Sequence, residues 1–540
     1  MEMGHFARTV LTKRYAHTDS ETWPEIAHRV ATNVMGAVGA SCDLVADVEQ
    51  LIRERKFMPG GRYLAMAGRP YHQTQSCLML RVEDSREGWG EHLQKSMVSL
   101  MTGAGIGCEY SRLRPEGAAI ARTGGASSGP LALMRATNEV GRGSLQGGSR
   151  RAALWAGLNW QHPDIYKFIV QKNWSPEIRA LKEKDFNFPA VMDFTNISVG
   201  IDDDFFCGLP GRVDDKRQQR AADVYSKTIR NMLETGEPGF SINLGRWRNE
   251  DLHNACTELC SEDDSDICNL GSINLARIGS LAEMDTAVEL ATMFLLAGTV
   301  YSDVPYQKVA DVRAKNRRLG LGLMGIHEWL LQRGSRYQPN KELALYLTRY
   351  ASSGHYAKMW ASHWNLSVPV KTRAIAPTGT ISIIAETTSG VEPIFCAAYR
   401  RRYFDRGTWR ESVVLDPTAK RLIESGIDPD KVEDAYALAA DIRRRLEFQA
   451  WLQGYVDHAV SSTINLPAWG TPWNCEDTVK SIGNAILEFL PRLRGLTVYP
   501  DGARGGQPLV PMSYREAVKE IDASVEAADV CDLRGGSCGS

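Results

Sequence analysis

Short apolar segments that resemble β-strands alternate with long helical patterns along most of the chain, and this alternation constrains the fold more than any other feature. The strand-like segments lie at 195–201, 267–275, 318–326, 372–384 and 495–502. Helical patterns separate them, for example at 285–300, 340–362 and 433–460. Such alternation predicts a mostly parallel sheet with covering helices, and we expect the sheet to close into a barrel.

The remaining regions divide the chain into three expected parts. Residues 1–56 form an N-terminal helical region, because 18–56 combine N-cap candidates with a helical apolar pattern. Pro59, Gly60 and Gly61 predict a loop at 57–64 that leads into the main body, residues 57–510. Residues 511–540 are polar and end in a Gly/Ser-rich stretch, which predicts a flexible C-terminal tail.

Composition excludes several classes of protein. The chain has 540 residues, 43% of them hydrophobic, which is enough for a large core, and its net charge of −2 lacks the basic excess of nucleic-acid binders. No apolar run reaches the ~18 residues of a membrane helix, and the first residues lack the apolar region of a secretory signal. We therefore expect a cytoplasmic protein whose eleven cysteines form no structural disulfide framework.

The stretch NACTELCSEDDSDICNLGSIN, residues 254–274, places cysteines beside a carboxylate. Cys256 lies between Asn254 and Glu258 with one residue on each side, and Cys268 follows twelve residues later. The spacing does not suit zinc, and a neighbouring carboxylate raises the pKa of a thiol, which disfavours a thiolate nucleophile. A thiyl radical at Cys256 with Glu258 as general base therefore suits the pattern better than a nucleophile. This stretch alone, however, favours the simpler interpretation, a buried strand cysteine beside a solvated carboxylate.

Two other places hold thiols that chemistry could use. Cys531 and Cys538 are separated by DLRGGS, and two thiols on a flexible terminus can exchange with a disulfide elsewhere. The alternative is a pair of incidental tail cysteines. Cys77 opens an apolar strand ahead of a helical pattern at 88–101, and by itself it is typical of a core cysteine.

Three glycine-containing segments are candidates for binding anions. In APTGTISIIAETTSGVEP, residues 376–393, small hydroxyl residues and a glycine at a helix start leave backbone N–H groups free to hold a phosphate. It is not a P-loop, because no lysine follows the glycine. A dinucleotide-binding glycine motif follows a strand and opens a helix, whereas TGAGIG at 102–107 follows a helical pattern, so it does not predict a dinucleotide site. LQGGSRRAALW at 145–155 suits either a surface turn or an anion contact.

Together these motifs resemble the large, catalytic subunit of ribonucleotide reductase. They occur in the family's order from about Phe57 to the C-terminus. They are Asn-x-Cys-x-Glu at 254–258, Cys-Asn-Leu-Gly-Ser-Ile-Asn at 268–274, Pro-Thr-Gly-Thr-Ile-Ser at 377–382, Ser-Gly-Val-Glu-Pro at 389–393 and the tail cysteine pair. The resemblance implies an α/β fold, a ten-stranded barrel of two parallel five-stranded halves, with the radical cysteine on a central finger loop.

The resemblance also implies radical-based reduction of ribonucleotides to 2′-deoxyribonucleotides, with a role for each residue of the site. Cys256, as a thiyl radical, takes the 3′ hydrogen of the ribose. Glu258 accepts the 3′-hydroxyl proton, and Asn254 orients the substrate. Cys77 and Cys268 form the reducing pair: one protonates the departing 2′-hydroxyl, and the two end as a disulfide.

Further residues follow from the same resemblance. Cys531 and Cys538 reduce that disulfide and pass the oxidation to a thioredoxin-like reductant. The residues implied for substrate binding are Ser76, Pro377, Thr378, Gly379, Thr380, Ile381 and Ser382. Those implied for a nucleotide effector, a dNTP or ATP, are Asp84, Ser85, Arg114 and Arg150. Family members usually have small residues after this last arginine, whereas this chain has Arg151, Leu154 and Trp155.

The source of the radical distinguishes the classes of this family. Class I enzymes receive the radical from a separate metal-containing subunit through two adjacent tyrosines in the strand before the tail. Here Val498 precedes Tyr499, a pattern similar to class II, the adenosylcobalamin-dependent enzymes. No C-terminal glycyl-radical motif of class III is found. We expect class II, with class I and its radical-generating small subunit as the alternative, and no metal site in this chain.

Two alternatives from other classes remain at this stage. A non-catalytic nucleotide-binding regulator is disfavoured by the five cysteines and Glu258, and a glycyl-radical lyase by the missing glycyl motif. The expected partners are a ribonucleotide, an effector and a reductant, with neither nucleic acid nor membrane, and a homodimer is an option that the sequence leaves open. Residues 1–56 are too few for the ATP-cone domain of the family. Sequence leaves open the di- or triphosphate form of the substrate, the oligomeric state and the effector rules.

Overall fold

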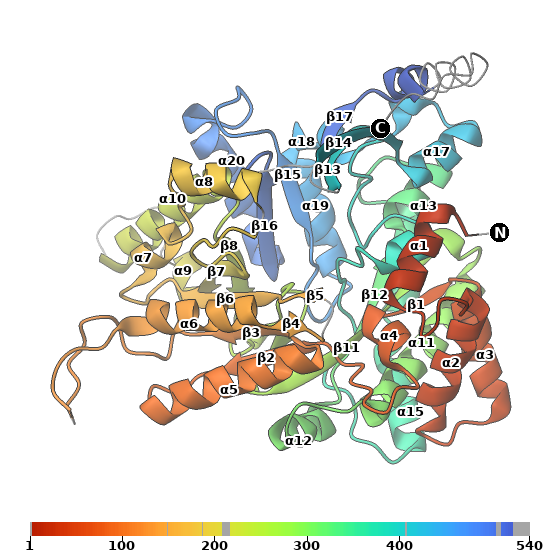
Figure 1. Ribbon diagram of the computed structural model, residues 1–540, viewed down its shortest axis with the longest axis horizontal. Helices are drawn as coiled ribbons and strands as arrows, with labels where there is room; N and C mark the ends of the chain where they lie inside the picture. The colour runs from red at the N-terminus through yellow and green to blue at the C-terminus, as the bar shows by residue number, and fades with distance from the viewer. Residues whose placement is uncertain are drawn as a thin grey trace.

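The computed structural model describes residues 3–121, 123–147, 150–185, 187–207, 216–405, 408–503 and 509–521. A large sheet of ten strands lies at the centre, and helices cover its outer surface (Figure 1). The predicted α/β fold is confirmed. Among the described residues, no helix has both the length and the apolar character needed to cross a membrane.

Five parallel strands form the first half of the barrel. They are β2 (Cys77–Arg81), β3 (Gly105–Glu109), β6 (Leu154–Asn159), β7 (Thr195–Asp202) and β8 (Gly239–Asn243). Each pairs in parallel with the next, in this order. Parallel neighbours need crossover connections, which here carry helices. These are α5 (Arg86–Thr102), α6 (Gly129–Gly143), α7 (Ile165–Val170), α8 (Pro176–Lys184), α9 (Asp203–Cys207) and α10 (Lys216–Thr235), with a hairpin of β4 (Leu145–Gln146) and β5 (Arg150–Arg151).

The second half is also parallel. Its strands are β11 (Asp266–Asn274), β12 (Leu319–Met324), the segment 372–376, β15 (Thr463–Leu466) and β16 (Gly495–Pro500). β11 pairs with β12, and β15 with β16. Parallel bridges at Leu321–Arg373 and Ile375–Val460 connect the segment 372–376 to both sides.

Two antiparallel seams join the halves into a ring. β2 pairs with β11 at one seam, and β8 pairs with β16 at the other. The expected barrel of two parallel five-stranded halves is therefore confirmed. The ten hydrogen-bonded strands of the sheet include the short strand β1 (Phe57–Pro59), which pairs antiparallel with β11 outside the ring. The segment 372–376 is not one of these ten and completes the ring through isolated bridges.

One long helix of the second half packs between the barrel and the N-terminal helices (Figure 1). Helix α11 (Leu281–Tyr301) is buried around most of its circumference and contacts both groups, as expected for a helix that is hydrophobic all round. The N-terminal helices are α1 (His5–Arg14), α2 (Trp23–Gly36), α3 (Cys42–Arg53) and α4 (Gly61–Met66). The others are α12 (Gln307–Asn316), α13 (Ile326–Gln332), α14 (Lys341–Tyr350), α15 (Ser353–His363), α16 (Ile381–Ala385), α17 (Pro417–Glu424), α18 (Ala435–Ala439), α19 (Ile442–Gln453) and α20 (Val479–Phe489).

Several boundaries differ from those expected. The segment 57–64, expected as a loop, contains β1 and the start of α4, because Pro59 ends an edge strand where its missing N–H is tolerated. The pattern at 340–362 forms two helices, α14 and α15, which break at a Ser-Ser-Gly run that favours turns. The strand-like stretch 372–384 is extended only to 376 and then turns into α16. The helical pattern at 433–460 breaks into α18 and α19 and becomes extended from 459 onward.

The start of the expected tail is ordered. β17 (Leu509–Met512) adds to the sheet formed by β13 (Ala398–Asp405) and β14 (Thr408–Leu415), and residues 514–521 are helical. Pairing along β13 gives the backbone of 509–512 hydrogen-bond partners that composition alone did not indicate. Cys531 and Cys538 lie outside the described residues.

Candidate active site

The stretch Asn254–Glu258 forms a finger loop inside the barrel. It connects two short antiparallel strands, β9 (Leu252–His253) and β10 (Cys260–Ser261). The Thr257 N–H donates to the Asn254 carbonyl at 3.0 Å, which closes a tight turn, and Thr257 has a left-handed φ of 64°. Cys256 therefore lies at the tip of the loop.

Glycines on the surrounding strands make room for this loop. Gly105 and Gly107 are two residues apart on β3, so they face the same side of the sheet. A Cβ at Gly107 would overlap the carbonyl oxygen of His253, and one at Gly105 would lie 3.3 Å from the Ala255 Cβ. The Gly-x-Gly-x-Gly run at 103–107 thus admits the finger loop, in agreement with rejecting it as a dinucleotide site.

Cys77 and Cys268 occupy opposite positions on β2 and β11, at the antiparallel seam between the two half-barrels. Opposite residues of an antiparallel pair have Cα atoms ~4.5–5.5 Å apart, within the range of a disulfide. Both cysteines are buried and reduced in this structure. A small side-chain movement is therefore enough to join them.

The three thiols of the site are all held protonated. Burial raises the pKa of Cys77, of Cys256 and of Cys268, and the charge of Glu258 adds to this effect at each of them. The Cys256 side chain is exposed to water that enters the cavity, but the cavity itself lies deep inside the protein, so protein atoms surround the thiol on most sides. Protonated thiols are donors of hydrogen atoms and protons, whereas a nucleophilic cysteine needs a thiolate.

Glu258 is a candidate general base. Burial raises its pKa to about 7, partly offset by hydrogen bonds, including one with the Asn254 side chain. Its Oε2 has no hydrogen-bond partner among the described residues. The side chain of Asn254 accepts from the Leu259 N–H at 3.0 Å, which stabilises the loop that carries both residues. A buried carboxyl that titrates near neutrality and has a free oxygen suits proton abstraction from a substrate.

These groups meet in a cavity of about 280 Å³. The predicted residues that line it are Asn254, Cys256, Glu258, Ser76, Cys77, Pro377, Thr378, Gly379, Thr380 and Ile381. Cys268 is fully buried on β11, and its thiol contacts the Asn269 carbonyl at 3.2 Å. Ser382 is also buried and reaches the Gly379 carbonyl at 3.4 Å. Segments far apart in the sequence therefore form one site.

The loop 377–382 forms one wall of the cavity. Its fold depends on Thr378, which has φ of 51° and whose hydroxyl accepts from the Gly390 N–H at 2.7 Å. A Cβ at Gly390 would lie 2.6 Å from the Ala376 carbonyl oxygen, so the Ser-Gly-Val-Glu-Pro segment can support the loop only with glycine there. The loop leads into α16, with Thr380 at the N-cap.

The four predicted effector residues do not come together. Asp84 and Arg114 form an ion pair at 2.7 Å, and Ser85 caps α5 by accepting from the Gly88 N–H. The backbone of Arg150 lies opposite that of Gln146 in the β4–β5 hairpin, and Gln146 lines the cavity at the other end of α5. Helix α5 separates the two ends by ~25 Å.

The sequence analysis did not identify Arg62. Among the described residues that line the cavity, Arg62 is the one with a positively charged side chain. Its Nη2 donates to the Thr102 carbonyl at 2.8 Å, and its guanidinium lies where side chains at Gly103 and Gly147 would be. Arg62 thus connects α4 to the end of α5 and to the β4–β5 hairpin. The one sequence feature that could have indicated this role is an arginine directly after two glycines, in a segment whose pattern predicts only a loop.

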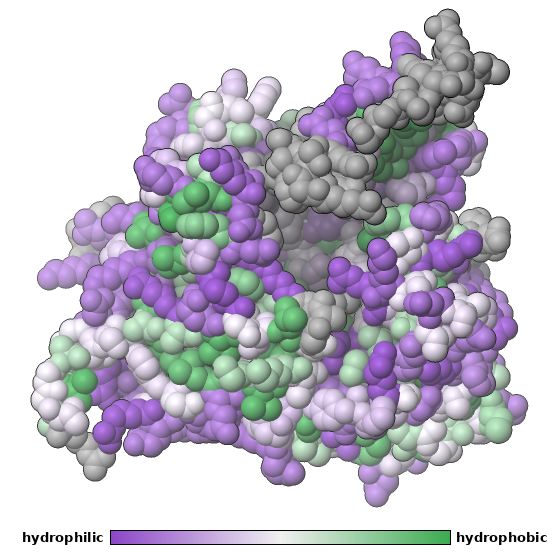
Figure 2. All heavy atoms as spheres, in the orientation of Figure 1, coloured by the Kyte–Doolittle hydropathy of each residue, from purple (hydrophilic) through white to green (hydrophobic). Residues whose placement is uncertain are grey.

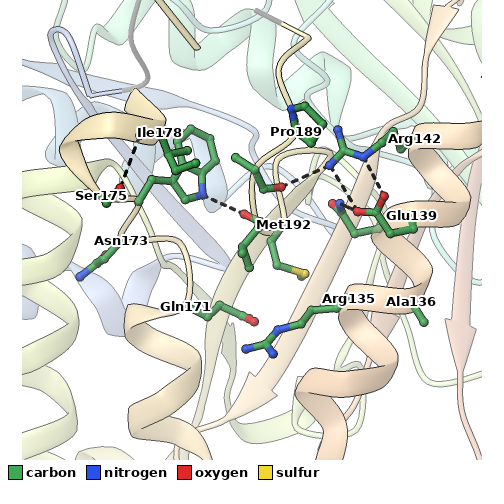
Figure 3. Close-up of a pocket in the computed structure, with 14 residues that line it drawn as sticks. Arg135, Ala136, Glu139, Arg142, Gln171, Asn173, Ser175, Ile178, Pro189 and Met192 are labelled. Carbon is green, nitrogen blue, oxygen red and sulfur yellow. Dashed lines mark hydrogen bonds and ion pairs between the residues drawn. The ribbon is translucent and has the colours of Figure 1, made fainter. Parts of the chain in front are cut away.

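A larger cavity of about 600 Å³ lies elsewhere, between α6, α8 and the segment 189–192 (Figure 3). Its one carboxylate, Glu139, is paired with Arg142 at 2.7 Å. The side chains around it include Ile178, Pro189 and Met192, and none of the described residues that line it is a cysteine. We therefore assign the chemistry to the smaller cavity, where thiols and an unpaired carboxyl oxygen converge.

Comparison with known proteins gives a consistent family. Residues 75–209, 210–357 and 370–488 match the ribonucleotide reductase barrel domain, and residues 1–72 match the ribonucleotide reductase all-alpha domain. A vitamin B12-dependent ribonucleoside-diphosphate reductase of Mycobacterium tuberculosis is 29% identical over 96% of this chain and 82% of its own length. A putative adenosylcobalamin-dependent ribonucleoside-triphosphate reductase of Mycobacterium phage D29 is 27% identical over 89% of this chain and 90% of its own.

Among solved structures, the alpha subunit of the class Id ribonucleotide reductase of Actinobacillus ureae is similar in fold. The TM-score is 0.72 at 16% identity, over 92% of this chain and 97% of that one. At this level of identity the likeness concerns the fold alone.

Proposed function

This chain belongs to the ribonucleotide reductase large-subunit family, and we propose that it reduces ribonucleotides to 2′-deoxyribonucleotides with adenosylcobalamin as its radical source. The observation that carries the proposal is the placement of Cys77 and Cys268 opposite each other beside Cys256 and Glu258. A radical centre, a base and a two-electron reductant are the three functions that the reaction needs.

The residues act in a definite order. Cys256, as a thiyl radical, takes the 3′ hydrogen atom of the ribose, while Glu258 accepts the proton of the 3′-hydroxyl. A thiol of the Cys77–Cys268 pair then protonates the 2′-hydroxyl, which leaves as water. The pair supplies two electrons and ends as a disulfide, and Cys256 returns a hydrogen atom to C3′. Asn254 holds the loop in place and orients the ribose.

The loop 377–382 is proposed to hold the substrate phosphates, together with Ser76. Thr378, Gly379 and Thr380 border the cavity at the start of α16, where backbone N–H groups favour anions. Arg62, on the wall near the β4–β5 hairpin, adds a positive charge to the same cavity. The named relatives include a diphosphate and a triphosphate reductase, so both forms are to be assayed.

The sequence of strand β16 fits a cobalamin-dependent enzyme better than a tyrosine relay. Strand β16 passes the finger loop at Gly495, where a Cβ would lie 3.7 Å from Thr257 Oγ1 and 3.8 Å from the Phe240 carbonyl oxygen, both ordinary contact distances. Val498 is fully buried in the core beneath the covering helices, and Tyr499 has no tyrosine neighbour in the strand. The Cys256 side chain is exposed at the loop tip and lines the cavity, so a bound cofactor would reach it there. When bound, adenosylcobalamin supplies the oxidising equivalent that generates the Cys256 radical.

The proposal extends to partners. Cys531 and Cys538 would reduce the Cys77–Cys268 disulfide and be reduced by a thioredoxin-like protein. We also propose that a nucleotide effector binds near Asp84, Ser85 and Arg114, at the N-terminal end of α5. Arg150, at the other end of α5, belongs to the hairpin proposed to couple the effector to the substrate.

A homodimer through α5 is part of the same proposal. Met101 on α5 is 56% exposed and Leu145 on β4 is 64% exposed, and Met97 and Val98 are exposed beside them. Hydrophobic side chains gather over α5 and α6 on the face in Figure 2. Light scattering on the purified chain, with and without dNTP, is expected to give twice the monomer mass.

The decisive test of the proposal is an assay of the purified chain alone. With adenosylcobalamin, a dithiol reductant and each ribonucleoside di- or triphosphate, we expect deoxynucleotide formation. Activity that instead needs a metal-loaded partner protein, with none from cobalamin, would place the chain in class I and contradict the cofactor assignment.

A further inference from the structure

Basic side chains converge at the end of the second half-barrel where its parallel strands begin. Arg318 directly precedes β12, and Arg494 directly precedes β16. Lys371 and His458 precede the extended segments that start at 372 and 459. Strands of a parallel half-barrel begin at one end, so the four side chains lie at the end opposite to the loop 377–382. This cluster has no part in the proposed chemistry.

The cluster contacts the base of the finger loop. The Cys260 N–H donates to His458 Nδ1 at 3.2 Å, and Arg318 Nη2 donates to the Ser261 hydroxyl at 3.2 Å. The charges of Arg494, Lys371 and Arg318 all act on the Cys260 thiol, which shows that they surround β10.

The buried groups of the cluster present hydrogen-bond donors without acceptors. Arg494 Nε and Nη1, Arg318 Nη1 and His458 Nε2 have no partner among the described residues. Burial, with the charge of Lys371, lowers the pKa of His458, so its ring is neutral. Because its Nδ1 accepts from Cys260, its Nε2 carries the proton and is a donor. Arg494, Arg318 and His458 are 5%, 4% and 0% exposed, so bulk water does not reach them.

The charges of the cluster do not balance. Arg318 pairs with Asp266 at 2.7 Å, whereas Lys371 and Arg494 share one carboxylate, Glu250. Among the neighbours, Arg373 has its own partner in Asp457, at 3.4 Å. Burial raises the pKa of Cys260, so its thiol is neutral. Lys371 Nζ and the Arg494 guanidinium also lie over the Trp247 ring, at 4.0 and 5.2 Å from its centre. Arg494 Nη2 donates to Glu250, which leaves only Nε and Nη1 without an acceptor among the described residues. Burial, with the charge of Arg494, lowers the pKa of Lys371, as expected where two cations share one carboxylate. With Lys371 protonated, the cluster carries one positive charge more than its carboxylates balance, which is costly without a counter-ion.

We propose that this cluster is a binding site for a small monovalent anion of the chloride class, held by Arg494, Arg318 and His458 beneath the finger loop. The anion supplies the missing negative charge and accepts hydrogen bonds from the N–H groups that otherwise have no acceptor. Through His458 and Arg318 it links the base of the loop at Cys260 and Ser261 to the strands of the second half-barrel. The inference is independent of the proposed function.

The first test uses bromide as the probe, on crystals of the full chain. Anomalous scattering is expected to show a bromide within ~3.5 Å of Arg494 and His458. Density for water alone at this position would overturn the proposal.

The second test measures thermal unfolding in sodium chloride and in sodium gluconate at equal ionic strength. A ligand that binds only the folded state raises Tm, so chloride is expected to raise the wild-type Tm by at least ~1 °C over gluconate. Arg494→Gln and the charge-retaining Arg494→Lys are expected to lose this difference. The matched control Arg492→Gln, at an exposed position two residues away, is expected to keep it.

The two readouts together decide between a site and non-specific salt effects. An equal chloride effect in wild type and both Arg494 variants overturns the proposal. A bromide peak seen only at molar bromide, without any chloride effect on Tm, means an adventitious ion only and also overturns it. If Arg494→Gln fails to fold, the Arg494→Lys comparison and the wild-type crystals still give the answer.

Discussion

Cys77 and Cys268 face each other across the seam where the two half-barrels meet, one on β2 and one on β11. Each half-barrel thus contributes one thiol. The register of an antiparallel pair fixes both Cα positions, so the distance between the thiols does not depend on a flexible loop. Cys256, in contrast, comes to the same cavity on a loop with a left-handed residue at its tip.

Cys256→Ser is expected to abolish turnover while the fold and nucleotide binding remain. The O–H bond of serine is too strong for the residue to act as the radical relay. Deoxynucleotide formation measures activity, and equilibrium binding measures the substrate site. The control is Cys42→Ser, at an exposed position on α3. Measurable product from the Cys256 variant would contradict the radical assignment.

Glu258→Gln is expected to lower kcat by ~10²–10⁴-fold, the usual contribution of a general base. Because the pKa of Glu258 is about 7, wild-type kcat/KM is expected to rise with pH up to this value. A pH profile that stays flat between pH 6 and ~8 would exclude Glu258 as the base.

The same pKa predicts an effect on stability. The folded state raises the pKa of Glu258 from 4.5 to about 7, so folding binds a proton between these values. Stability then falls as pH rises through this window, by an amount on the order of 3 kcal/mol above pH 7. Glu258→Gln is therefore expected to raise Tm at pH 8 and to leave it nearly unchanged at pH ~4. Equal changes at both pH values would show that the carboxyl is not destabilised by burial.

Gly107→Ala is expected to displace the finger loop, because a Cβ there overlaps the His253 carbonyl. Activity should fall severely, while circular dichroism still shows the α/β fold. The matched control is Gly105→Ala, whose Cβ would lie 3.3 Å from the Ala255 Cβ and needs only a small adjustment. Similar activity in both variants would mean that β3 does not position the loop.

Tyr499→Phe is expected to retain most activity with adenosylcobalamin. An electron hole passes between adjacent phenol rings in a tyrosine relay, and Val498 offers no ring. Tyr499 packs near Gly236, where a Cβ would lie 3.7 Å from its ring, so a phenylalanine fits the same place. An inactive variant that still binds nucleotide would favour class I.

Local motifs predicted part of the site. Asn254, Cys256 and Glu258 lie within five residues, so one turn brings them together, and their chemistry follows from residue type. The opposition of Cys77 and Cys268 came only from family resemblance, because strand register at a seam depends on the whole barrel. The role of Gly107 was invisible for a similar reason, since the atom it avoids belongs to a loop far along the chain.

The sequence predicted the elements that have a clear apolar pattern. It missed element boundaries that depend on local turn residues or on pairing with a distant strand. The strands at 195–201, 267–275 and 318–326 are present nearly as expected, because continuous apolar runs mark buried parallel strands. The break between α14 and α15 and the ordering of 509–512 depend on a Ser-Ser-Gly run and on pairing with β13. Arg62 was missed because a loop prediction gives no side-chain positions.

The most direct measurement of the central claim is a single turnover with the tail cysteines removed. In the double variant Cys531→Ser and Cys538→Ser, the oxidation cannot leave the Cys77–Cys268 pair. The pre-reduced variant is mixed with adenosylcobalamin and a labelled ribonucleotide, quenched with a thiol-blocking reagent and digested for mass spectrometry. We predict one Cys77–Cys268 disulfide for each deoxynucleotide formed, and no further product when thioredoxin is added. Deoxynucleotide formed while both thiols remain free would contradict the assignment of this pair as the reductant.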